Sequence, residues 1–132
     1  MADRRAARRH DVQVSGVNRE RAEKRGRSAE TLACWFLRLR GWRIVARRVR
    51  ARGGEVDIVA RRGRTLAFVE VKARATSEAA AFALDEWRLR RVAAAAEQLT
   101  PRFMRDGDDV RIDAIFVLPR QWPRHLADVW QG

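Results

Sequence analysis

The spacing of apolar residues alternates along the chain between a three-to-four-residue period and a two-residue period, which predicts both helices and strands. A helical period runs from about Ser28 to Arg40, and Gly41 follows it at the position expected for a C-terminal cap. We expect this helix to bury Cys34 as a small apolar residue. The apolar stripe expected to face the core consists of Leu32, Trp35, Phe36 and Leu39.

Strand-like runs follow, separated by turns that contain glycine or proline. They cover residues 42–49, 55–60, 65–74 and 110–118, and residues 125–130 are expected to form a further short strand or a turn. The Ala-rich segment 79–99 reads as a second helix that Pro101 ends. Its buried stripe is expected to be Leu89, Val92, Ala96 and Leu99.

This order of elements predicts an α/β fold, with a mixed sheet of four or five strands flanked by helices in the order α-β-β-β-α-β. Strands joined by short turns should pair antiparallel, whereas the strand after the long helix can return parallel. The 132 residues suit one domain. We expect residues 26–132 to form it and residues 1–25 to be a flexible basic arm.

Charge narrows the choice of partner. Lys and Arg number 29 against 17 Asp and Glu, so the formal net charge is +12 and the expected partner is nucleic acid. An arginine-rich proteome would produce the same bias. A single cysteine excludes an internal disulfide, and the sequence shows neither an apolar run long enough to cross a membrane nor a secretory signal, so the expected location is the cytoplasm.

Candidate chemistry lies on the strand 65–74. Alternation puts Ala67, Val69 and Val71 on one face, and Glu70 and Lys72 on the other with Leu66 and Phe68. If Gly63-Arg64 is a two-residue hairpin loop, Asp57 lies opposite Glu70, with Cβ atoms about 5 Å apart. A four-residue loop would instead bring Glu55 opposite Glu70.

Two facing carboxylates repel unless a cation lies between them, and oxygen ligands of this kind suit Mg²⁺ or Mn²⁺. Lys72 could then orient an attacking water and offset charge that develops on a phosphate. The alternative is an ordinary ion pair between Glu70 and Lys72 on a strand, without catalysis.

The paired segments Gly54-Glu55-Val56-Asp57-Ile58-Val59-Ala60 and Phe68-Val69-Glu70-Val71-Lys72-Ala73-Arg74 resemble the small bacterial YraN family, of the UPF0102 type. The spacing from Asp57 to Glu70-Val71-Lys72 also resembles the PD-(D/E)xK signature of restriction-endonuclease-like nucleases, although Val56 stands in place of its proline. The resemblance spans about residues 26–130. The chain departs from the family at Arg48, where Asn is usual, and at Arg88, where Lys is common.

The resemblance implies a restriction-endonuclease-like fold, similar to Holliday-junction resolvases and tRNA-splicing endonucleases. It implies a metal-dependent endonuclease that hydrolyses phosphodiester bonds of DNA, at branched or single-stranded structures. Asp57 and Glu70 would hold Mg²⁺ or Mn²⁺, Glu30 would assist as a third ligand, and Lys72 would orient water. Glu30 is also explained by its place in the first turn of a helix, where the macrodipole favours an acid.

Two other functions stay open: a nucleic-acid-binding module without turnover, and an RNA-processing nuclease. DNA is favoured over RNA, and cutting two strands would require a homodimer. The arginines expected to contact phosphates are Arg61, Arg62, Arg64, Arg74, Arg88 and Arg91.

Aromatic and buried polar residues complete the expectations. Trp35 and Trp42 are expected in the core, whereas Trp87, Trp122 and Trp130 could pack or stack on bases. Asp113 lies among apolar residues, so we expect it to pair with an arginine rather than to act in catalysis.

Overall fold

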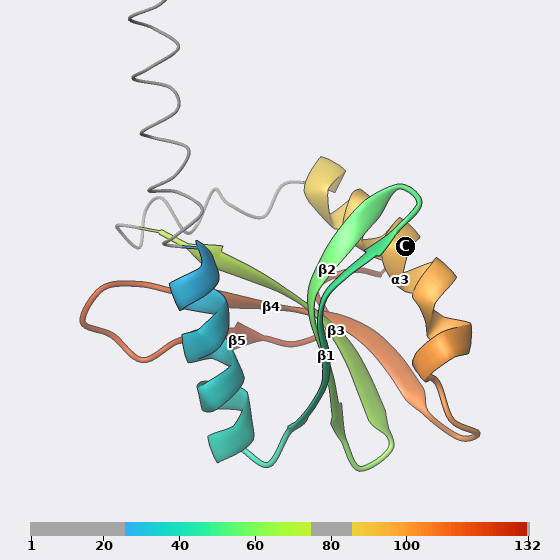
Figure 1. The fold of residues 1–132 in the computed structure, drawn as a ribbon, viewed down its shortest axis with the longest axis horizontal. Coiled ribbons are helices and arrows are strands. Elements are labelled where there is room, and N and C mark those ends of the chain that lie inside the picture. The colour runs from blue at the N-terminus through green and yellow to red at the C-terminus, as the bar shows by residue number, and fades with distance from the viewer. Residues whose placement is uncertain (1–25, 75–85, 132) are drawn as a thin grey trace, which may run out of the picture.

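The fold is that of an α/β protein whose five-stranded mixed sheet is flanked by helices, as the sequence predicted (Figure 1). The computed structural model describes residues 26–74 and 86–131. A first helix covers residues 26–39. The remaining elements are β1 (Arg43–Ala51), β2 (Gly54–Arg62), β3 (Thr65–Ala73), α3 (Glu86–Phe103), β4 (Asp109–Val117) and β5 (Arg124–Leu126).

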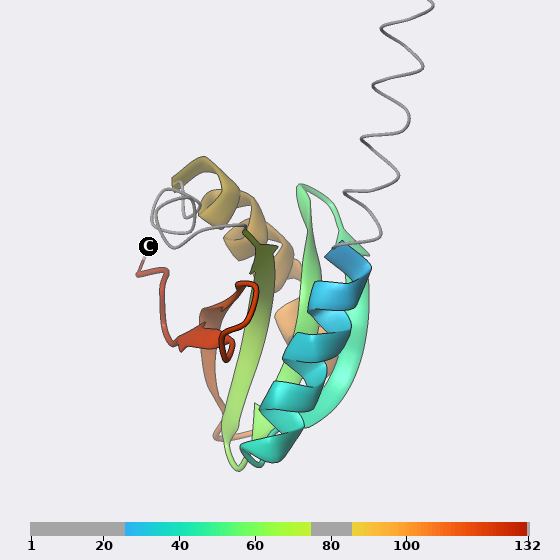
Figure 2. The same ribbon diagram turned by 90° about the vertical axis from the view of Figure 1, so that its left-hand side faces the viewer.

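The strands lie in the sheet in their order along the chain. Neighbouring strands are antiparallel except β3 and β4, which are parallel and are connected through α3. The first helix and α3 pack on opposite faces of the sheet, as both ribbon views show (Figures 1 and 2). Each face of the central strands is therefore covered by a separate apolar cluster.

The first helix ends as expected but faces the sheet with a different side. Gly41 has a φ of +88°, and Trp42 N–H donates to Leu37 O at 2.9 Å, which is the backbone closure of a glycine-capped helix. Of the predicted apolar stripe, Phe36 is buried as expected, but the prediction is wrong for Leu32, Trp35 and Leu39, which are 46%, 59% and 74% exposed. Small residues bring this helix close to the sheet, and the side chains that it buries are Ala29, Glu30, Ala33, Cys34, Phe36 and Leu37.

The helix α3 buries its predicted stripe against the other face. Val92, Ala96 and Leu99 pack with Phe68 and other residues in one cluster. Gly54 allows the close approach of the helix, since a Cβ at this position would lie 2.5 Å from Arg91 O. The prediction that Pro101 ends this helix is wrong. Met104 N–H still donates to Thr100 O at 2.8 Å, and α3 runs to Phe103.

The β2–β3 hairpin has a two-residue loop, the first of the two loop lengths that the sequence left open. Arg62 pairs with Thr65 across Gly63 and Arg64, and Gly63 has a φ of +61°. The faces of β3 are also as predicted, with Ala67 and Val69 against the first helix, and Leu66 and Phe68 against α3. The alternative register, in which Glu55 faces Glu70, is excluded.

Some expectations lie outside the described residues. They are the basic arm over residues 1–25 and the part of the predicted second helix over residues 79–85. Within the two described ranges, no helix is long and apolar enough to cross a membrane.

Candidate active site

The acids predicted to act together lie where β2 and β3 stop pairing. The last pair of the ladder is Ile58 with Val69, and Asp57 and Glu70 are the next residues on their strands. Instead of a backbone carbonyl, the carboxylate of Asp57 accepts the N–H of Val71, at 2.7 Å from Oδ2. The carboxylate therefore lies between the two strands, in the gap that their separation opens.

Glu70 and Lys72 form a close ion pair beside this gap. Lys72 Nζ lies 2.6 Å from Glu70 Oε1, and each side chain is only 10% exposed. The second oxygen, Glu70 Oε2, is buried and finds no hydrogen-bond partner in the part of the chain that the structure describes. A buried carboxylate oxygen without a partner is unusual, because leaving it unpaired costs about 1–3 kcal/mol.

The first helix brings Glu30 toward the same acids. Glu30 is buried, and its Oε2 accepts from Arg48 Nε at 2.6 Å. Arg48 has a φ of +51°, a backbone conformation that residues other than glycine and asparagine rarely adopt. This conformation lets an edge-strand arginine reach the helix, and a shallow depression of about 370 Å³ lies there, lined by Gly26, Arg27, Glu30, Arg48 and Glu55.

The surroundings of Asp57 disfavour its charged form. Burial raises its pKa most, the hydrogen bond from Val71 N–H opposes this, and the charges of Glu30 and Glu70 raise it further, so that the pKa of Asp57 is about 7. The ammonium of Lys72 lowers it in part. The pKa of Arg48 is raised, mainly by its hydrogen bond to Glu30 and further by the charges of Glu30, Glu55 and Asp57.

Asp57 and Glu70 suit a divalent cation in two respects. Their carboxylates repel one another, and Glu70 offers a buried oxygen that no described residue binds. Glu30 fits less well as a third ligand, because Arg48 already occupies one of its oxygens. Over residues 26–74 and 86–131, no group of three His, Cys, Asp or Glu side chains is close enough together to hold a metal ion.

Comparison with known proteins places this arrangement in a family. The family described as "Uncharacterised protein family UPF0102" matches residues 29–117, which include all four predicted site residues. The chain belongs to the UPF0102 family. Relatives named UPF0102 protein align with this chain over nearly their whole length. That of Sphingopyxis alaskensis is 59% identical over 115 residues, which cover 87% of this chain and 99% of the relative.

Two further relatives agree with the assignment. The UPF0102 protein of Rhizorhabdus wittichii is 58% identical over 114 residues, covering 86% of this chain and 97% of its own. That of Methylorubrum extorquens is 50% identical over 117 residues, covering 88% and 91%. The resemblance inferred from the segments around Asp57 and Glu70 is therefore confirmed at the level of the family.

In this UPF0102 protein, the arginines of the β2–β3 hairpin lie far from the acids. Arg62 and Arg64 are five and seven residues from Asp57 along the chain, and a strand rises about 3.4 Å per residue. Arg62 stacks over Trp42 and donates to Arg40 O at 3.3 Å. Arg61, expected to contact phosphate, is instead buried in an ion pair with Asp108, at 2.7 Å.

The other predicted phosphate contacts occupy different parts of the surface. Arg74 directly follows β3 and donates to Ala73 O at 2.7 Å. Arg91 is exposed on α3, donates to Gly53 O at 3.2 Å and lies over the ring of Trp87. Arg88 is exposed on the same helix. Of the predicted set, Arg74 is the arginine that lies just beyond the strand carrying Glu70 and Lys72.

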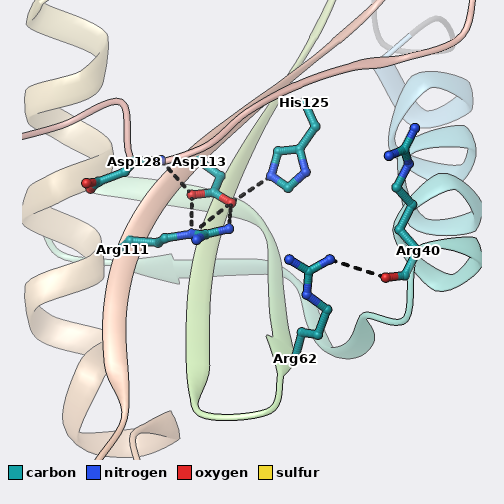
Figure 3. A network of polar contacts seen from close by, with 6 residues as sticks. All are labelled: Arg40, Arg62, Arg111, Asp113, His125 and Asp128. Carbon is teal, nitrogen blue, oxygen red and sulfur yellow. Dashed lines mark hydrogen bonds and ion pairs between the residues drawn. The ribbon is translucent and has the colours of Figure 1, made fainter.

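A second polar network lies on β4 and β5, and it includes a residue that sequence reasoning did not place there. Asp113 is fully buried and accepts from Arg111 Nε at 3.0 Å, as the predicted pairing with an arginine requires. His125 Nε2 lies 2.7 Å from its Oδ2, and Asp128 N–H donates to its Oδ1 at 3.0 Å (Figure 3). The short strand expected after Pro123 was the sequence signal that could have placed His125 in this network. In the structure, that strand pairs His125 with Ile115.

The tryptophans divide between core and surface. Trp42 is 3% exposed, as predicted, and its ring centre lies 4.5 Å from the guanidinium of Arg62 and 5.4 Å from that of Arg111. Trp35, expected in the core, is 59% exposed and lies beneath Arg38, whose guanidinium is 5.4 Å from the ring centre. The other exposed tryptophans are Trp87 at 63% and Trp122 at 78%.

Proposed function

We propose that this UPF0102 protein is a divalent-metal-dependent endonuclease that hydrolyses phosphodiester bonds of DNA, with branched or single-stranded structures as its substrates. The observation that carries the proposal is the unpartnered Oε2 of Glu70 beside Asp57, at the point where two strands separate. Carboxylates kept in mutual repulsion, at a cost in stability, are typical of functional sites.

Each residue has a role in this proposal. Asp57 and Glu70 would hold Mg²⁺ or Mn²⁺, and Glu30 would assist after release from Arg48. The bound metal would supply positive charge to the scissile phosphate. Lys72 is held by Glu70 at 2.6 Å, so its ammonium has a fixed position from which to orient water and to offset charge on the phosphate.

The electrostatic environment supports a polyanionic substrate. The net charge of +12 attracts nucleic acid, and the exposed Arg27 and Arg48 line the depression beside Glu30, together with Glu55. Arg48, released from Glu30, would be available to a phosphate group at this position.

The test is an incubation of the protein with labelled junction, flap, single-stranded and duplex DNA and with RNA, in Mg²⁺, Mn²⁺ or chelator. We expect metal-dependent cutting of DNA that falls by at least about 100-fold in Glu70→Gln and in Lys72→Met. Glu97→Gln, which changes an exposed acid on α3, is the matched control and should cut normally. Circular dichroism of each variant verifies folding.

A nucleic-acid-binding module without turnover is the second candidate. It is favoured by the two ion pairs, because Arg48 and Lys72 each occupy an oxygen of an acid that a metal would need. Retarded mobility of every nucleic acid without cutting in any metal would establish it and overturn the nuclease. Preferential cutting of RNA would overturn the choice of DNA.

A further inference from the structure

The first helix and β1 carry an exposed surface of one charge. Residues 26–51 contain seven arginines and one acid, Glu30, which is buried and paired. The exposed arginines of this segment are Arg27, Arg38, Arg40, Arg43, Arg47, Arg48 and Arg50. A surface with such a bias favours a polyanion and repels a second copy of itself.

Two of these arginines connect the strand to successive residues of the helix. Arg48 Nε binds Glu30 at 2.6 Å, and Arg47 Nη2 lies 3.3 Å from Thr31 Oγ1. Arg38 lies near the same place, because Arg47 and Arg38 both lower the pKa of Cys34 while burial, the larger effect, raises it. The junction of the helix with β1 is therefore lined by guanidinium groups.

Trp35 stands on this surface, one helical turn beyond Thr31. Its ring is 59% exposed and lies beneath the guanidinium of Arg38 at 5.4 Å. Burying an indole is worth several kcal/mol, so a large aromatic ring left in solvent among arginines has no role in the core. An exposed aromatic ring beside guanidinium groups is suited to bind unpaired bases, because every base has a flat face that can stack.

We propose that Trp35, Arg38 and Arg47 form a binding site for a single nucleic-acid strand, which leads to Arg48 and Glu30. Trp35 stacks on an unpaired base, and Arg38 and Arg47 bind the phosphates on either side. Duplex DNA offers no unstacked base, so the site distinguishes a single strand from a duplex. This inference deepens the proposed function by naming the form of the substrate, and rests on that function for its catalytic consequence.

The test is the fluorescence anisotropy of a labelled oligothymidylate and of a duplex of equal length, both in chelator. In the full chain, Trp35→Ala should weaken binding of the single strand by about tenfold and leave duplex binding within about twofold. Trp35→Phe, which keeps an aromatic face, should retain most of the affinity. Arg38→Gln and Arg47→Gln should each lower the affinity and its dependence on salt.

Trp87→Ala is the matched control, because Trp87 is 63% exposed and lies beneath Arg91 at 5.1 Å, but on α3, against the opposite face of the sheet. It should leave single-strand binding within about twofold. Equal losses in Trp35→Ala and Trp87→Ala, or equal losses for single strand and duplex, would overturn the site.

Sedimentation separates this site from a protein interface. A dimer that Trp35→Ala converts to a monomer would show that the stripe of Leu32, Trp35 and Leu39 binds a second copy, and would overturn the inference. Because binding is measured without metal, its outcome is independent of cutting. Cutting that persists with binding indifferent to Trp35 would refute this inference alone, whereas selective binding without cutting would refute only the nuclease.

Discussion

Asp57 and Asp113 lie on the same sheet, but their surroundings shift their pKa values in opposite directions. Asp57, half-buried on β2, accepts one backbone N–H and has two acids near it, and its pKa rises to about 7. For Asp113, fully buried on β4, burial alone would raise the pKa. Hydrogen bonds from His125, Asp128 N–H and Arg111 outweigh burial, so its pKa is lowered (Figure 3).

The difference separates a network that stabilises its buried charge from one that destabilises it. Around Asp113 each carboxylate oxygen has partners, and the network fastens the C-terminal segment to β4. Around Asp57 the partners are too few and the neighbours have the wrong charge, which stores unfavourable energy that a cation could release. Burial of an acid therefore does not by itself indicate a functional site. A buried acid with too few hydrogen-bond donors around it is the better indication.

The largest expected effect is the loss of the Asp113 network. Asp113→Ala leaves Arg111 and His125 without their carboxylate in a buried position, which should lower the free energy of unfolding by about 3–5 kcal/mol. Urea denaturation followed by circular dichroism measures it. Asp106→Ala, in an exposed turn, is the control and should change it by less than about 0.5 kcal/mol. Equal values for the two variants would remove the stabilising role of Asp113.

Asp57→Asn should raise the free energy of unfolding, whereas Asp113→Ala lowers it. The amide oxygen still accepts from Val71 N–H, and the repelling charge is removed, so the apo protein should gain about 1–2 kcal/mol at pH 8 in chelator. This is less than the full shift implies, because Asp57 is not fully buried and solvent screens part of its charge.

The pH dependence checks the sign of this effect. Because the pKa of Asp57 is higher in the folded chain than in the unfolded chain, the folded state binds more protons between about pH 4 and pH 7. The contribution of Asp57 to wild-type stability should fall as the pH rises through that range. The advantage of Asp57→Asn should grow over the same range, and an advantage independent of pH would contradict the raised pKa.

The contribution of Asp108 to stability should depend on pH in the opposite direction from that of Asp57, and by a smaller amount. Its hydrogen bond from Arg61 is the main cause that lowers the pKa of Asp108, to about 2, so its contribution to stability is present above the unfolded pKa near 4 and is lost toward pH 2. Asp108→Asn should lower the Tm at pH 7, by less than Asp113→Ala does, and converge with the wild type near pH 2. A difference in Tm that persists at pH 2 would speak against this ion pair as the cause.

Alternation and turn chemistry predicted the strands at the centre of the molecule but left two registers open between β2 and β3. The structure has the register set by the Gly63-Arg64 loop, in which Asp57 and Glu70 follow the last pair of the ladder. The face of the first helix was not predictable in this way. Its apolar residues outnumber those that the sheet can cover, and the side that packs on the sheet combines the small Ala29 and Ala33 with Leu37.

Ion pairs between residues far apart in the sequence could not be predicted from local sequence patterns either. Arg61 finds Asp108 and Arg48 finds Glu30 only after the chain has folded, so charge alone could not separate these arginines from those on the surface. The one local signal was Arg48, which departs from the Asn that the family resemblance implies. A φ of +51° suits asparagine, and arginine at this position places a cation beside Glu30.

Arg48→Asn has the smallest expected effect and tests that addition directly. The ion pair with Glu30 is lost, but Arg48 is 44% exposed and asparagine tolerates the backbone conformation, so the Tm should change little. On the proposed function, freeing Glu30 should tighten Mn²⁺ binding by no more than about fivefold, as measured by isothermal titration calorimetry. Weaker Mn²⁺ binding would instead mean that Arg48 positions Glu30 for the metal and does not compete with it.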